Sequence, residues 1–282
     1  MVSTMSKIKS LVITGYGINC EYETAYANSL AGAEPDIAHI NDVIDGQYRL
    51  EDYQILNFPG GWSFGDDLGS GKVFVNKLLY AKTPTGPLAD QILKFIDDGR
   101  LVIGICNGFQ ILVKMGLLPA LDRDYKTQSC TLFFNDHGFR DAWVKLKINT
   151  KSPCVFTKGI ETLDAPIRHG EGKFIPANRQ LLDRLTRNGQ IVMQYVDRFG
   201  RPTMQFPDNP NGSMEGIAGI CDETGRVFGL MPHPEAFNHI TNHPHYTRMR
   251  EAAARKGETL KEEGDGIQIW RNAVEYARQK LI

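Results

Sequence analysis

Short apolar runs rich in β-branched residues alternate with helical stretches through residues 10–115, and this alternation constrains the fold most. Ser10–Gly15, Tyr53–Phe58 and Arg100–Ile105 have the composition of buried strands. The intervening stretches have helical spacing, and helices are predicted at Cys20–Ala31, Lys72–Ala81, Leu88–Asp98 and Asn107–Met115. Strands that alternate with helices form parallel sheets. The pattern therefore predicts an open, mostly parallel twisted sheet flanked by helices.

The second half of the chain has a different pattern. Ala142–Ile148 alternates apolar with polar residues, as a half-exposed strand does, so additional antiparallel strands are expected. Further predicted elements are strands at Ile191–Val196, Ile217–Cys221 and Val227–Met231 and a helix at Asn178–Asn188. Phe206–Gly216 is expected to be a polar surface loop.

No linker long enough to separate two domains interrupts the sequence, so residues 1–282 are predicted to form a single domain. The segment Ala252–Gly266 mixes Lys and Glu and is expected to be solvated. Residues 267–282 then form a predicted C-terminal amphipathic helix.

Composition excludes several classes of protein. Lys and Arg total 32 against 33 Asp and Glu, so the chain has no bulk charge with which to hold a nucleic acid. No apolar run approaches the roughly 20 residues that span a bilayer, and the run Leu11–Ile13 is broken too early for a secretion signal. The five cysteines are scattered without a CxxC pair, which excludes a disulfide scaffold and a zinc knuckle. A cytoplasmic protein is therefore expected.

The sharpest local signal is the G-x-C-x-G motif of Gly104–Gly108, between an apolar strand and a helix. Such a strand-to-helix turn is sharp and strained, and it presents the central residue as a nucleophile. The helix N-terminus favours the thiolate of Cys106, and the amide of Asn107 is placed to donate to an oxyanion. The alternative is a buried cysteine at a tight turn.

A thiolate nucleophile needs a base, and His233 is the strongest candidate. It follows the predicted strand Val227–Met231, and open α/β sheets place their sites at the carboxyl ends of strands. Prolines on both sides are expected to hold the backbone extended, so that His233 and Glu235 face the same way. Glu235 would then orient the imidazole. A surface loop that happens to contain this sequence is the alternative.

The third motif is the glycine-rich loop Pro59–Asp66, after a predicted strand. Adjacent glycines let backbone amides approach a ligand closely, so Gly60 and Gly61 could supply a second oxyanion donor. Neither nucleotide-binding glycine pattern is present in this loop, which argues against a phosphate site.

Together, PGG at Pro59–Gly61, GICNGFQ at Gly104–Gln110 and PHPE at Pro232–Glu235 resemble the class I glutamine amidotransferase family. The chain is most similar to the branch formed by the glutaminase subunits of phosphoribosylformylglycinamidine synthase, in purine biosynthesis. The segments typical of that branch are GYGINCEYET, PGGWSFGDDLGSG, PIRHGEGKF, Asn211–Ser213 and IAGI. The resemblance covers roughly residues 8–237 and implies a flavodoxin-like open sheet.

The resemblance also implies roles for individual residues. Cys106 would attack the glutamine carboxamide, His233 would protonate the leaving ammonia and later activate water on the thioester, and Glu235 would orient His233. The residues implied in oxyanion and glutamine binding are Gly60, Gly61, Asn107, Gln110, His169, Gly170 and Glu171.

The same resemblance implies the partners. Ammonia would pass to an ATP-dependent synthetase subunit that converts formylglycinamide ribonucleotide to formylglycinamidine ribonucleotide, and a small third subunit is expected in the complex. ATP and Mg²⁺ would bind to the synthetase, and no cofactor or metal is expected on this chain.

The sequence departs from the family pattern after PHPE, where Ala236 and Phe237 stand in place of a frequent arginine. Residues 238–266 look like an insertion or a charged tail. This segment contains His239, His243 and His245, but no cysteine or carboxylate completes a metal site with them.

Two other functions stay open. One is a different cysteine-elbow hydrolase, or an amidotransferase with another ammonia acceptor. The other is an interaction subunit in which the elbow has no catalytic role. The intact set of Cys106, His233 and Glu235 argues against the second.

Overall fold

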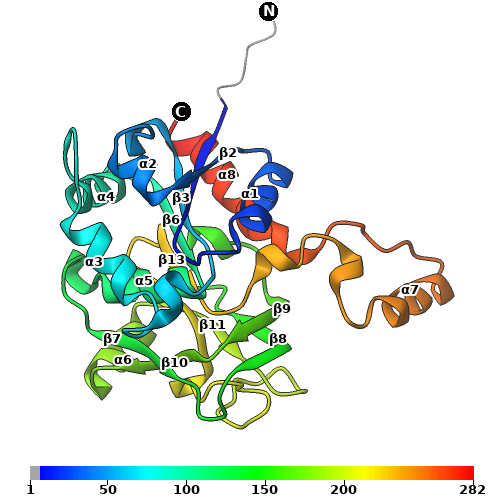
Figure 1. The fold of residues 1–282 in the computed structure, drawn as a ribbon. Helices are drawn as coiled ribbons and strands as arrows, with labels where there is room; N and C mark the ends of the chain where they lie inside the picture. Colours follow the sequence, from blue (N-terminus) through cyan, green and yellow to red (C-terminus); the bar gives the residue numbers. More distant parts are fainter. Residues whose placement is uncertain (1–6) are drawn as a thin grey trace, which may run out of the picture.

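The computed structural model describes residues 7–282, so residues 1–6 of the predicted domain lie outside the described residues. In this part of the chain, nine strands form one sheet in the order β2-β1-β3-β6-β13-β12-β11-β8-β9 (Figure 1). The first five are parallel. They are β1 (Lys9–Thr14), β2 (Glu34–His39), β3 (Ile55–Phe58), β6 (Leu101–Ile105) and β13 (Val227–Leu230).

The remaining strands of the sheet are antiparallel to their neighbours. They are β8 (Arg140–Ile148), β9 (Thr162–His169), β11 (Ile191–Tyr195) and β12 (Ile217–Cys221). The predicted open α/β sheet with additional antiparallel strands is therefore confirmed. Two short antiparallel pairs complete the strands: β7 (Cys130–Phe134) with β10 (Glu171–Pro176), and β4 (Lys82–Thr83) with β5 (Gly86–Pro87).

Helices cover both faces of the parallel half. Helices α1 and α8 pack against each other on one face, and α3, α4 and α5 pack on the other (Figure 1). None of the helices in residues 7–282 is long and apolar enough to cross a membrane. The helices are α1 (Glu21–Leu30), α2 (Ile40–Ile44), α3 (Lys72–Tyr80), α4 (Leu88–Asp97), α5 (Asn107–Lys114), α6 (Arg179–Arg187), α7 (Tyr246–Arg255) and α8 (Gln268–Lys280).

The sequence pattern missed β2, the edge strand with sequence EPDIAH. Its proline and two acidic residues are unfavourable inside a sheet but are tolerated at an edge, where one side of the strand needs no partner. Strands β7, β9 and β10 were also missed, although β9 pairs with β8 over its full length.

A buried polar network joins the N-terminal half of the sheet to the last helix. Asn57 on β3 donates to Ser10 Oγ at 2.8 Å and accepts from Asn28 Nδ2 and Trp270 Nε1, both at 3.2 Å. All four side chains are fully buried. Because each polar atom has a partner, the network fixes how α1 and α8 sit on the sheet.

The expectation of a surface loop at Phe206–Gly216 is wrong for its second half. Asn211 and Ser213 are fully buried. Asn211 Nδ2 donates to Gly172 O at 2.9 Å, and Ser213 Oγ accepts from Phe174 N at 2.9 Å. Their side chains satisfy the backbone of β10, which explains why polar residues lie inside.

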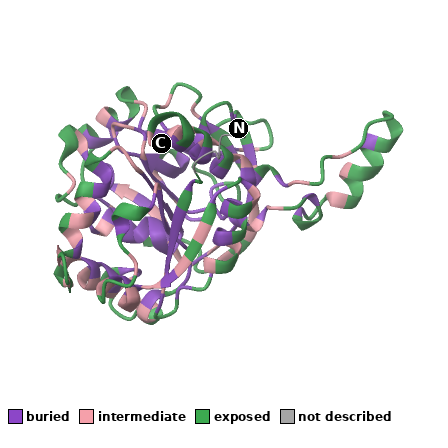
Figure 2. Ribbon diagram, turned by 90° about the horizontal axis from the view of Figure 1, so that it is seen from above, coloured by how far each residue is buried: buried purple, intermediate pink, exposed green. Residues whose placement is uncertain are grey.

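Residues 238–266 form an arm that projects from the body of the molecule and contains α7 (Figures 1 and 2). At the base of the arm, Ile240 N donates to Glu262 O at 2.8 Å and Gly264 N donates to Asn238 O at 3.0 Å. Ala253 is the buried residue of α7. The solvated character expected for the charged stretch agrees with this arrangement.

We expect Asn57→Ala to lower the free energy of unfolding by about 2–4 kcal/mol, because Ser10, Asn28 and Trp270 would each lose a buried partner. Urea unfolding followed by tryptophan fluorescence measures the change. The exposed Gln279→Ala on α8 is the control and should change stability by less than about 0.5 kcal/mol. Equal stability of the two variants would contradict the structural role of the network.

Candidate active site

Cys106 occupies a strained turn between β6 and α5. Its backbone has φ 52° and ψ −106°, a conformation that non-glycine residues rarely adopt. A Cβ on Gly104 would lie 2.6 Å from Gly108 O, and a Cβ on Gly108 would lie 1.8 Å from Phe58 O. Both glycines are therefore required by close packing, and the predicted elbow geometry is confirmed.

His233 follows β13, the parallel neighbour of β6. Its Nδ1 lies 2.6 Å from Glu235 Oε1, and both side chains are buried. The extended backbone predicted here is wrong beyond His233, because Pro234–Ala236 form a 3₁₀ turn. This turn brings Glu235 back to the imidazole, and the backbone amide of His233 is held by Pro166 O of β9 at 2.8 Å.

The charges around His233 determine its protonation. Burial alone would lower the pKa of His233, but the charge of Glu235 and then Cys106 raise it well above its usual value. His233 Nε2 and Glu235 Oε2 are buried and have no hydrogen-bond partner among the described residues. The geometry thus leaves one imidazole nitrogen free for chemistry while Glu235 holds the other.

Gly60 marks the point where the site residues meet. A Cβ built on Gly60 would lie 2.7 Å from His233 Cε1, 3.3 Å from Cys20 Sγ and 3.4 Å from Cys106 Cβ. No larger residue fits there. Gly61 has φ 150°, and a Cβ on it would lie 2.5 Å from Gly17 O. The backbone amides of Gly61 and Asn107 donate to no acceptor within residues 7–282, as oxyanion donors require.

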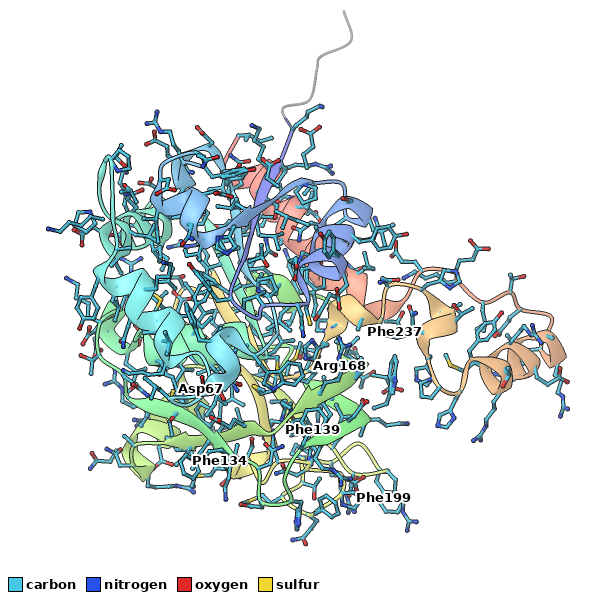
Figure 3. The ribbon with its side chains drawn as sticks, viewed as in Figure 1. Asp67, Phe134, Phe139, Arg168, Phe199 and Phe237 are labelled. Carbon is cyan, nitrogen blue, oxygen red and sulfur yellow. The ribbon has the colours of Figure 1, made fainter. Side chains whose placement is uncertain are left out.

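A pocket of about 270 Å³ opens over the cysteine. Arg168, at the end of β9, is one of its walls and lies near the base of the arm (Figure 3). Arg168 Nη2 forms an ion pair with Glu23 Oε1 at 3.8 Å, too far for a hydrogen bond, and has no hydrogen-bond partner in the described chain. The residues that line the pocket are Asn19, Cys20, Glu23, Gly61, Trp62, Cys106, Arg168 and His233.

Several residues predicted to bind glutamine lie behind the pocket instead of in its wall. Gln110 Nε2 donates to Glu171 O, and Gln110 Oε1 accepts from Asn107 Nδ2 at 2.9 Å. Asn107 Nδ2 also donates to Asp66 Oδ1 at 3.1 Å. These contacts join α5, the glycine-rich loop and β10, so they support the pocket from outside.

His169 is buried beside this framework, and Gly170 connects β9 to β10. Burial, and then the charge of His233, lowers the pKa of His169 to about 3. His169 Nδ1 lies 3.2 Å from Asn135 Nδ2. The imidazole of His169 is therefore neutral, so it packs beside the site without adding a charge to it.

The sequence interpretation missed Glu23, Arg168, Trp62 and the position of Cys20. Cys20 precedes the first residue of α1, and its Sγ lies 4.0 Å from His233 Nδ1. Asn19, Cys20 and Glu23 belong to GYGINCEYET, Trp62 to PGGWSFGDDLGSG and Arg168 to PIRHGEGKF, so the segments that carry the family resemblance were the available signal. Nothing local marked the pairing of Glu23 with Arg168.

The site therefore combines a strained cysteine, a histidine with a raised pKa and two free amides at one edge of an α/β sheet. A family model described as the CobB/CobQ-like glutamine amidotransferase domain matches residues 7–277. The chain belongs to this glutamine amidotransferase family.

Curated relatives give the branch. The chain is 46% identical over 279 residues to phosphoribosylformylglycinamidine synthase subunit PurQ of Methanococcus maripaludis, covering 98% of this chain and 99% of that protein. It is 44% identical to the PurQ subunit of Dehalococcoides mccartyi, covering 98% and 100%. The chain thus belongs to the PurQ subunits, and the motif-based resemblance is confirmed. The first alignment takes in the arm, because it covers nearly all of the chain.

Solved structures agree. The structure of PurLQS from Thermotoga maritima has a TM-score of 0.68 and 28% identity, covering 96% of this chain and 99% of that chain. A putative GMP synthase component from Thermoplasma acidophilum shares the fold at a TM-score of 0.52, with 13% identity and coverage of 96% and 94%.

We expect Glu235→Gln to lower kcat/KM for glutamine hydrolysis about 10²-fold without abolishing it, because orientation is only part of the barrier reduction. The charge of Glu235 raises the pKa of His233, so its removal should move the alkaline limb of the pH–rate profile to lower pH. The exposed Glu161→Gln is the control. An unshifted profile would show that Glu235 does not set the protonation of His233.

Proposed function

We propose that this chain hydrolyses glutamine at Cys106 and delivers the ammonia to a synthetase subunit that forms formylglycinamidine ribonucleotide. Residues 7–282 contain one nine-stranded sheet, two short strand pairs and one continuous apolar core, so we propose that the chain acts as a single domain. The observation that carries the substrate assignment is the pair of opposite charges in the pocket wall.

Arg168 and Glu23 suit the two charged ends of an α-amino acid. The guanidinium has a donor without a partner, which a carboxylate can fill, and Glu23 can accept from an ammonium group. Their long separation of 3.8 Å leaves both groups available to a ligand. Cys106 lies in the same pocket, so an amide on the side chain of that amino acid would reach the sulfur.

The reaction follows from this placement. The Cys106 thiolate adds to the amide carbon, and the resulting oxyanion is held by the amides of Gly61 and Asn107. The protonated His233 gives its Nε2 proton to the leaving nitrogen, which departs as ammonia and leaves a thioester. His233 then takes a proton from water, the hydroxide attacks the thioester, and glutamate leaves while Cys106 regains its thiolate.

The partner assignment rests on the relatives. The PurQ subunits and the PurLQS structure are named for a multi-subunit synthase. We propose the same arrangement here, with a synthetase subunit that binds ATP and Mg²⁺, with a small third subunit, and with the complex located in the cytoplasm. A different cysteine hydrolase is disfavoured, because nothing in its chemistry requires a charge pair suited to a free amino acid.

We expect Cys106→Ala to abolish glutamine-dependent synthesis by the complex with the synthetase, at least about 10³-fold. Synthesis with added ammonium chloride should survive, because the synthetase does not need this site. The assay measures product with each nitrogen source, and Cys130→Ala is the control for loss of a buried thiol elsewhere. Unchanged use of glutamine by Cys106→Ala would overturn the assignment.

We expect Arg168→Gln to raise KM for glutamine about 10- to 100-fold with little change in kcat, because an ion-paired hydrogen bond to the substrate is lost. 4-Aminobutanamide lacks the α-carboxylate, so its weak hydrolysis should be equal in the variant and the wild type. The exposed Arg179→Gln is the control. Equal losses for both amides would mean that Arg168 does not bind the carboxylate.

A further inference from the structure

Cys20, His233 and Glu235 form a cluster of metal-binding side chains at the inner end of the pocket. One ligand atom from each lies within 4.8 Å of the other two. We propose that these residues bind Zn²⁺ and that the bound ion stops glutamine hydrolysis. The inhibition rests on the proposed function, whereas the binding of the metal does not.

The distances suit a zinc site after small movements. Cys20 Sγ is 4.0 Å from His233 Nδ1, and Glu235 Oε1 is 2.6 Å from that nitrogen. Tetrahedral zinc holds thiolate, imidazole and carboxylate ligands about 3.3–3.6 Å apart, given its usual bond lengths. The sulfur therefore has to approach Nδ1 by roughly 0.4 Å, and the carboxylate oxygen has to retreat from Nδ1 by roughly 0.7 Å.

Unsatisfied polar atoms point independently to a ligand. The Glu235 side chain is fully buried, and its Oε2 has no hydrogen-bond partner among residues 7–282. An unpaired oxygen of a buried carboxylate is costly, and a cation at Oε1 or Oε2 would relieve the cost. No other group of three such side chains in the described chain, including the arm histidines, brings its ligand atoms this close together.

The pocket supplies access and the fourth ligand. Cys20 and His233 both line it, so an ion can enter from solvent. Three protein ligands and one open position are typical of zinc sites that keep a bound water. The Cys20 thiol must lose its proton to bind zinc, so affinity should rise with pH.

Zinc at this place would block the proton transfers of the reaction. Binding at Nδ1 removes the proton shared with Glu235, and the ion takes over that nitrogen's lone pair. The ring then carries its one remaining proton on Nε2. In that state Nε2 could protonate the leaving nitrogen only by becoming a zinc-bound imidazolate, which is far less favourable than loss of a proton from an imidazolium. Ammonia therefore does not leave, and the thioester does not form.

Titration of the full-length chain with Zn²⁺ tests the binding, by calorimetry and by competition with a chromophoric chelator. We expect one site, and at least about 10-fold weaker binding in Cys20→Ala. Cys106→Ala and Cys130→Ala should bind with affinity close to that of the wild type. With Co²⁺ as the probe, the thiolate charge-transfer band should disappear in Cys20→Ala and persist in Cys106→Ala.

The opposite pattern overturns the proposal. Binding that survives in Cys20→Ala and is lost in Cys106→Ala would place the ion on the nucleophile.

Inhibition is measured separately, with the rate of each variant compared to its own rate in chelator. Zinc should inhibit the wild type reversibly, and about 10-fold more zinc should be needed for Cys20→Ala. If zinc binds through Cys20 but glutamine hydrolysis is unaffected, the inhibitory role is refuted. If the metal-free chain with its synthetase hydrolyses no glutamine, the proposed function fails while the binding result still stands.

Discussion

The parallel pairing of β6 with β13 is the constraint on which the site depends. Ile105 lies opposite Leu230, and Cys106 N donates to Leu230 O at 2.8 Å. Two strands far apart in the sequence thereby end at the same edge, one delivering the nucleophile and the other the imidazole. Because both strands are fully buried, this register is fixed by the packing of the core and not by contacts within the site.

The cysteine turn and most of the parallel strands could be predicted from the sequence, because their signals are local. Gly104 and Gly108 flank Cys106 because a larger residue at either position would clash with the backbone, and the five-residue motif contains both glycines. The parallel strands were found because burial on both faces makes them continuously apolar. Strand β2 was not predicted, because an edge strand can carry charges and proline and so lacks the continuous apolar pattern.

The pocket walls could not be predicted in this way. Arg168 is a charged residue on an amphipathic strand, and Glu23 lies on a half-exposed helix, so each alone has the pattern of a solvated side chain. Only the fold brings them to the same opening. The motifs led instead to Gln110 and Glu171, whose contacts with each other belong to the support of the loop.

The imidazole of His169 lies close enough to His233 for the charge of His233 to lower the pKa of His169. Because the pKa of His169 is about 3, this ring stays uncharged over the whole range in which the enzyme would work. Only one of the two rings can then shuttle a proton, and the thiolate faces a single cation instead of a pair. The acid–base behaviour of the site should consequently follow one titrating imidazole, with its neighbour acting as a fixed dipole.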